Sequence, residues 1–124
     1  MKPITLLIFA LLLTPSAQAD GRLLLERCSE AVKMLDSSGG SALGGLKGGF
    51  CLGYIEGIVD YNVVTSVLIL DKPDGTFFCP PQNVTVGQYA RILTKFLREN
   101  PEILHESNSL VVTKAFGNAF PCPK

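Results

Sequence analysis

The sequence predicts an all-α fold, a small disulfide-bonded bundle of about four helices over residues 20–124. Two observations favour this class. Apolar side chains recur at helical spacing in several segments, and all four cysteines lie after residue 19. A chain of about 105 residues forms one domain with a modest core, which disulfides would reinforce.

Residues 1–19 have the features of a cleaved signal peptide. Lys2 provides a positive start, an apolar run covers residues 4–13, and Ala17-Gln18-Ala19 matches a cleavage site before Asp20. The run is too short for a membrane span, so we expect a periplasmic protein that leaves the membrane after cleavage. The full sequence has 11 basic and 11 acidic side chains, and removing Lys2 with the signal peptide leaves ten basic and eleven acidic ones. This near-neutral charge gives no indication of nucleic-acid binding.

The first helix is predicted over residues 20–35. Its buried stripe comprises Leu24, Cys28, Ala31 and Leu35. Residues 36–49 contain six glycines and are predicted to form a flexible linker. A phosphate-binding loop is not indicated there, because Lys47 precedes a glycine and no strand comes before it.

The second helix is predicted from Phe50 to about Leu70. Gly53 and Gly57 lie four residues apart, and with Tyr54 they predict close packing against a neighbour in the same chain or in a second subunit. Glycine disfavours a helix interior, so such packing would have to compensate. The β-branched end, residues 63–70, is also compatible with a buried strand.

Residues 71–76 read as a turn containing Pro-Asp-Gly, and residues 77–81 as an extended segment, since prolines disfavour helix before them. Thr85 and Gln88 form a predicted capping box that opens the third helix, which ends at Asn100. A fourth helix is predicted to start directly at Pro101. Its inward side chains would be Ile103, Leu104, Leu110, Val111, Ala115 and Phe116.

The four cysteines predict two disulfides. Cys28 and Cys51 flank the glycine-rich segment, while Cys79 precedes the third helix and Cys122 follows the fourth. We therefore expect the pairs Cys28–Cys51 and Cys79–Cys122 among the three possible connectivities. No short C-x-x-C spacing indicates zinc, and no metal or other cofactor is predicted.

Catalytic residues are sparse. His105 is the only histidine, and no Gly-x-Ser-x-Gly motif accompanies it. Glu56 and Asp60 fall one helical turn apart and could form a hydrolase acid pair. Two acids on a solvated helix face are the commoner arrangement, so we predict that the protein is not an enzyme.

Taken together, several motifs resemble the Rap/Tai family in the same order along the chain. They are Cys28, Cys-Leu-Gly-Tyr-Ile-Glu-Gly (51–57), Phe-Cys-Pro-Pro (78–81), Val-Thr-Val-Gly-Gln (84–88), Leu-Arg-Glu-Asn-Pro-Glu-Ile-Leu-His (97–105) and Ala-Phe-Pro-Cys (119–122). These proteins are periplasmic immunity proteins that neutralise cell-wall amidases delivered by type VI secretion. The resemblance implies a helical, disulfide-bonded domain, often a homodimer, that occludes the amidase active site.

A protruding segment on a rigid scaffold is the feature that an active-site groove requires. We therefore expect partner contacts in residues 71–78, including Asp71, Asp74 and Phe77, and in residues 39–49. A general periplasmic binding or chaperone-like protein is the alternative, and a small hydrolase is a second.

Overall fold

The computed structural model describes residues 20–37, 40–69 and 77–124. Over these residues the chain is helical, without strands: α2 (Gly21–Asp36), α3 (Ala42–Leu68), α4 (Val86–Glu99), the 3-10 turn η1 (Pro101–Ile103) and α5 (Asn108–Ala119). The predicted all-α class is confirmed, and the strand alternative for the end of α3 is wrong for residues 63–68. None of the described helices combines the length and apolar character that crossing a membrane requires.

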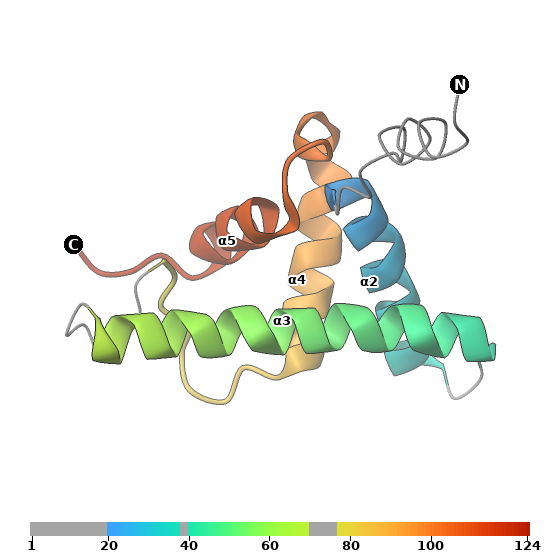
Figure 1. The fold of residues 1–124 in the computed structure, drawn as a ribbon, viewed down its shortest axis with the longest axis horizontal. Helices are drawn as coiled ribbons and strands as arrows, with labels where there is room; N and C mark the ends of the chain where they lie inside the picture. Colours follow the sequence, from blue (N-terminus) through green and yellow to red (C-terminus); the bar gives the residue numbers. More distant parts are fainter. Residues whose placement is uncertain (1–19, 38–39, 70–76) are drawn as a thin grey trace, which may run out of the picture.

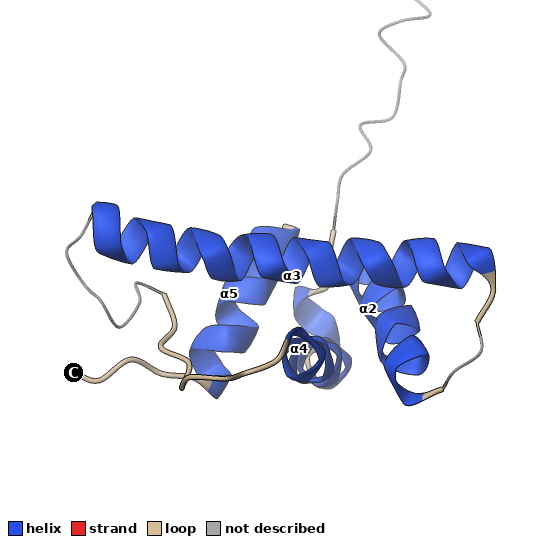
Figure 2. Cartoon of the chain, turned by 90° about the horizontal axis from the view of Figure 1, so that it is seen from below, coloured by secondary structure: helices blue, strands red, loops and turns tan. Residues whose placement is uncertain are grey.

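Helix α3 is the long element of the fold. Figure 1 shows α2 next to its N-terminal half and α5 above its C-terminal half, and Figure 2 shows the other helices on one side of it. The core lies between this inner side and the facing stripes of the shorter helices. It contains Leu24, Cys28, Ala31, Cys51, Ile55, Phe78, Tyr89, Ala90, Leu93, Leu97, Val111, Val112, Ala115 and Phe116. Leu35, predicted in the buried stripe, is exposed instead.

The glycine-rich segment is not a linker along its whole length. Ser41 caps α3 by accepting a hydrogen bond from the Gly44 amide at 3.0 Å, and the helix begins at Ala42. Gly44 and Gly48 are buried against α2. A Cβ at Gly48 would lie 3.1 Å from the Ala31 Cα and 2.5 Å from the Met34 sulfur, so glycine permits this close contact. Packing on α2 therefore offsets the poor helix propensity of these residues.

The third helix starts as predicted, whereas the fourth does not. The reciprocal capping box of Thr85 and Gln88 is present at the start of α4. After η1 the chain turns away, and α5 begins only at Asn108. The predicted start at Pro101 is therefore wrong, and Leu110, expected to face inward, is exposed.

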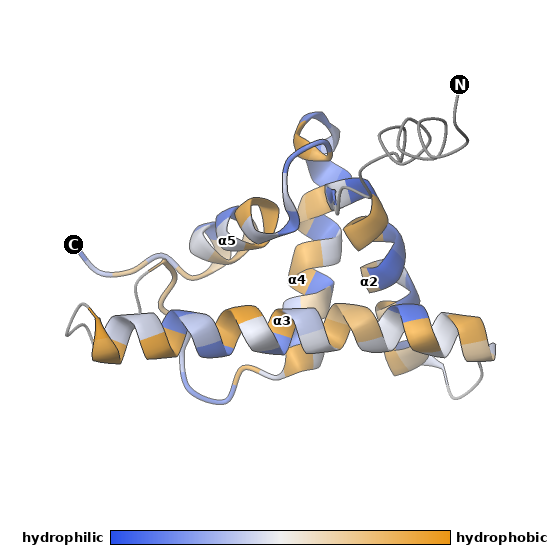
Figure 3. Cartoon of the chain, viewed as in Figure 1, coloured by the Kyte–Doolittle hydropathy of each residue, from blue (hydrophilic) through white to orange (hydrophobic). Residues whose placement is uncertain are grey.

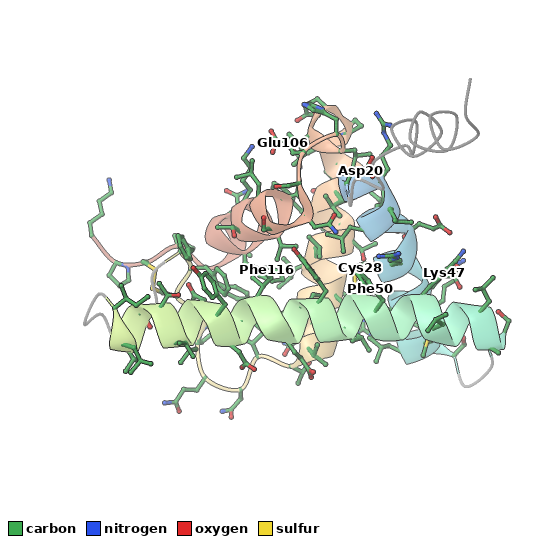
Figure 4. All side chains as sticks on the ribbon, viewed as in Figure 1. Asp20, Cys28, Lys47, Phe50, Glu106 and Phe116 are labelled. Atoms are coloured by element: carbon green, nitrogen blue, oxygen red, sulfur yellow. A yellow bond between two sulfur atoms is a disulfide. The ribbon has the colours of Figure 1, made fainter. Side chains whose placement is uncertain are left out.

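Helix α2 provides the physical reason for this break. Its first amides, those of Gly21 and Arg22, donate to the carbonyls of Glu106 and Leu104 at 3.1 and 3.2 Å. These hydrogen bonds pair backbone N–H groups that have no partner within the first turn of a helix. They also hold residues 104–106 in a non-helical conformation. Figure 4 shows Asp20 and Glu106 near each other at this end of the domain.

Both predicted disulfides are present. Cys28 joins Cys51, linking α2 to α3, and Cys79 joins Cys122, linking the segment before α4 to the segment after α5. Each pair connects parts of the chain that lie far apart in sequence, so both restrict the unfolded ensemble.

Candidate interaction surface

The outer face of α3 is defined here as Leu46, Phe50, Gly53, Gly57, Tyr61, Val64 and Leu68. Each of these residues is exposed, and the Arg27 side chain of α2 reaches this face at Phe50. These residues follow one another at three- and four-residue steps, opposite the buried side. A Cβ placed at Gly53 or Gly57 would meet no atom within 4 Å. The predicted neighbour within the same chain is therefore absent among the described residues, and the glycines of α3 that do contact another helix are Gly44 and Gly48.

Large apolar side chains flank these two exposed glycines. Leu46 is 72% exposed and Phe50 42% exposed. Tyr61, Val63, Val64, Val67, Leu68 and Ile69 are also exposed, and Figure 3 shows apolar residues recurring toward both ends of α3. An apolar surface of this length is typical of a protein contact region.

Tyr54 packs at the edge of this face. Its ring stacks on Phe50 with centroids 6.0 Å apart, and the Arg27 guanidinium lies over the Phe50 ring, 3.8 Å from its centroid. Burial raises the pKa of the Tyr54 phenol. Figure 4 shows Phe50 and Lys47 projecting from the N-terminal half of α3.

Asn62 fixes the segment that leads into α4. It is only 2% exposed; its side-chain oxygen accepts from the Phe77 amide and its side-chain nitrogen donates to the Phe78 carbonyl, both at 2.9 Å. Phe78 is buried, with its ring 5.3 Å from that of Phe116, and the Cys79 amide donates to the Phe120 carbonyl at 2.8 Å. Residues 77–79 are thus held to both α3 and the C-terminal segment.

The Phe77 ring remains outside this rigid attachment. It is 47% exposed and stacks on Tyr61 with centroids 6.5 Å apart. The two rings and Leu110 border a largely apolar hollow of about 310 Å³ between α3 and α5. A preformed apolar depression beside exposed aromatics is the type of surface that receives an anchoring side chain.

The structure describes only some of the other residues that were predicted to contact a partner. Asp71 and Asp74 lie outside the described residues, so the structure gives no position for them. Of residues 39–49, positions 42–49 belong to α3 and so do not form a protruding loop. Leu43 and Leu46 within this stretch are exposed on the helix surface.

The described residues contain no group of three or more histidine, cysteine, aspartate or glutamate side chains able to hold a metal ion. His105 is exposed in the turn after η1, and Glu56 and Asp60 are exposed on α3. The predicted solvated positions of the two acids are confirmed. Nothing in this arrangement resembles a nucleophile paired with a base.

Sequence reasoning missed Asn62, Tyr61 and Leu110. Asn62 carried a usable signal, because a single amide within the apolar end of a helix needs hydrogen-bond partners when buried. No sequence signal indicated that Tyr61 and Leu110 lie beside Phe77, since these residues come from three separate segments of the chain.

The family comparison agrees with this architecture. Residues 20–122 match the family model of the Rap1a immunity proteins. No curated protein and no solved structure gives a significant match. Because the model spans nearly all of the described domain, this chain belongs to the Rap1a immunity protein family.

Proposed function

We propose that this protein is a periplasmic immunity protein that binds a type VI-secreted peptidoglycan amidase and occludes its active site. Membership of the family supports a non-enzymatic role against a secreted effector protein. The amidase target comes from the motif resemblance described above.

The observation that carries the occlusion mechanism is the attachment of residues 77–79. A segment that inserts into a groove must be fixed before binding, because ordering it on contact costs affinity. Asn62 and the Cys79–Cys122 disulfide provide this fixation, while the Phe77 ring stays accessible. Asp71 and Asp74, earlier in the same connection, are proposed to contribute polar contacts.

Inhibition of the amidase is the direct test. Each amidase found encoded next to this gene is directed to the periplasm of a host cell, with and without the immunity protein. We expect lysis without it and growth with it, and the purified protein should stop peptidoglycan cleavage at equimolar concentration. Undiminished cleavage by every neighbouring amidase would contradict the proposal.

Phe77→Ala tests the contact surface, with Phe50→Ala as a matched control. Both rings are similarly exposed, but Phe50 lies near the other end of α3. Loss of an aromatic anchor typically costs about 2 kcal/mol or more of binding free energy, so Kd should rise about thirtyfold for Phe77→Ala only. Calorimetric titration measures both, and equal Kd values for both variants would exclude Phe77 as the anchor.

We propose periplasmic localisation through cleavage after Ala19. Two disulfides in a domain of this size are characteristic of exported proteins. N-terminal sequencing of the protein from a periplasmic extract should begin at Asp20. An intact Met1 in the cytoplasmic fraction would disprove export.

We further propose that a second copy covers the outer face of α3, giving a homodimer. Its apolar side chains need cover, and Gly53 and Gly57 permit close approach of another backbone. Gly57→Leu should yield a monomer in light scattering without loss of monomer stability. Gly45→Leu is the control, because a Cβ there also meets nothing within 4 Å, but Gly45 is not part of the outer face. An unchanged oligomeric state for Gly57→Leu would place the interface elsewhere.

The chaperone-like alternative is favoured by one observation, the exposed apolar residues of α3. Such a protein would suppress aggregation of an unfolded client such as reduced α-lactalbumin. An immunity protein would instead form one stoichiometric complex and leave that aggregation unchanged.

A further inference from the structure

A second hollow, of about 380 Å³, lies between α3 and the beginning of α4. The α3 side contributes Glu56 and Asp60, and the opposite side contributes Val84, Val86 and Tyr89. The hollow therefore combines two carboxylates with an apolar wall. It is separate from the apolar hollow beside Phe77.

The two carboxylates differ from most other acids of the described domain. Glu26, Glu30, Asp36, Glu99 and Glu106 each form an ion pair with a lysine or arginine, and Asp20 caps α2. Glu56 and Asp60 form no ion pair with any described residue. Like charges four residues apart on a helix repel each other, so a cation placed between them would be attracted by both.

Tyr89 gives an independent indication of a ligand. Its side chain is only 5% exposed and borders the hollow, while its ring packs 4.8 Å from that of Phe116 and 5.7 Å from that of Phe120. Its hydroxyl forms no hydrogen bond with the described residues. Burial also raises the pKa of this phenol, so the neutral hydroxyl is available to a donor. The ring is buried, whereas the hydroxyl oxygen is not among the fully buried unpaired atoms, so it reaches solvent and can accept a hydrogen bond from a ligand in the hollow.

We propose that this hollow receives a lysine or arginine side chain of the partner protein. The cationic end would lie against Glu56 and Asp60 and donate to the Tyr89 hydroxyl, and the aliphatic stem would lie along Val84 and Val86. Lysine and arginine combine these two requirements, because an apolar stem carries their charge. The identity of that partner as an effector rests on the proposed function, whereas the cation preference rests on the hollow alone.

The preference can be measured without any effector. Nα-acetyl-arginine amide, Nα-acetyl-lysine amide and the neutral Nα-acetyl-norleucine amide are titrated into the full domain, and amide shifts are followed by NMR. We expect saturable shifts around Glu56, Asp60 and Tyr89 with the two cations only. Shifts of equal size with the neutral probe, or shifts that do not saturate, would overturn the proposal.

Two variants identify the groups responsible. Glu56→Gln combined with Asp60→Asn keeps the shape of the hollow and removes its charge, and Tyr89→Phe removes one hydroxyl but keeps the ring. Probe binding should be lost in the first and weakened in the second. Glu102→Gln is the control, because Glu102 is also exposed and without a described ion pair, but lies in η1.

The same variants separate this proposal from the proposed function. The Glu56→Gln/Asp60→Asn protein should bind the partner amidase about tenfold more weakly at low salt, and Glu102→Gln should not. Unchanged amidase affinity of the double variant would remove the hollow from the interface. If no amidase binds the wild-type protein, the proposed function fails, while the probe titration still decides whether the hollow selects cations.

Discussion

The two halves of α3 carry similar residues but have different surroundings. In the N-terminal half, Gly44 and Gly48 lie against α2, and Cys51 is bonded to Cys28. In the C-terminal half, Gly57 has no neighbour within 4 Å, and most apolar side chains after Tyr61 are exposed. The first half holds the domain together, and the second offers surface to a partner while one buried amide, Asn62, fixes the adjoining segment. A glycine pair in a helix therefore acquires a structural role only from the elements that pack against it.

The largest expected effect comes from removing the Cys28–Cys51 disulfide with alanine at both positions. The bond closes a loop over a sequence separation of 23 residues, and in the loop-entropy model it contributes about 3 kcal/mol. Urea unfolding should show this loss, and hydrogen exchange should accelerate in the N-terminal half of α3. Unchanged exchange there would mean that packing alone holds this half.

Asn62→Ala should have the next largest effect. The variant leaves the Phe77 amide and the Phe78 carbonyl without their hydrogen-bond partner. A buried polar group left unpaired lowers the free energy of unfolding by about 2 kcal/mol. Affinity for the effector should fall as well, because residues 77–79 lose their attachment to α3. Asn118→Ala, at an exposed position of α5, serves as the control for thermal unfolding. Equal stability of both variants would contradict the assigned role of Asn62.

Identical substitutions compare the two glycine pairs directly. Gly48→Ala should destabilise by about 2 kcal/mol, because its Cβ would overlap Met34 and press on the Ala31 backbone. Gly57→Ala should instead stabilise the monomer by up to about 1 kcal/mol, since alanine favours the helix and no atom obstructs it. Chemical denaturation measures both, and a loss of stability in both variants would show that Gly57 also packs within the chain.

The smallest effect is expected for Lys47→Met. The Lys47 ammonium donates to the Glu26 carboxylate, and this hydrogen bond and charge hold the pKa of Glu26 below its usual range. A carboxyl group with a lowered pKa stabilises the fold when it is ionised and loses that contribution as the pH falls through its folded pKa. The pair is solvent-exposed, so any difference between variant and wild type should be small at neutral pH and should vanish in acid. A difference that persists in acid would indicate lost packing of the lysine stem.

Several parts of this comparison could be predicted from the sequence. The disulfide pairing followed from the order of cysteines and helices, and the start of α4 followed from Thr85 and Gln88, since a capping box involves only neighbouring residues. Phe77, which the sequence predicts as a partner contact, is exposed, whereas the apolar hollow beside it could not be predicted. That hollow requires Leu110 of α5. The start of this helix was predicted too early, because the hydrogen bonds between α2 and residues 104–106 cannot be seen in the sequence.

The helical class, the cysteine pairs and the capping box of α4 could be predicted from the sequence alone, because they depend on local backbone preferences and on the order of elements. The start of α3 and the glycines that meet a neighbour depend instead on tertiary packing. Glycine lowers helix propensity equally at Gly48 and Gly57, so no local rule separates them. The two glycines differ because α2 packs against only one half of α3. The Cys28–Cys51 disulfide joins α2 to that half, and Gly44 and Gly48 leave room for the close contact.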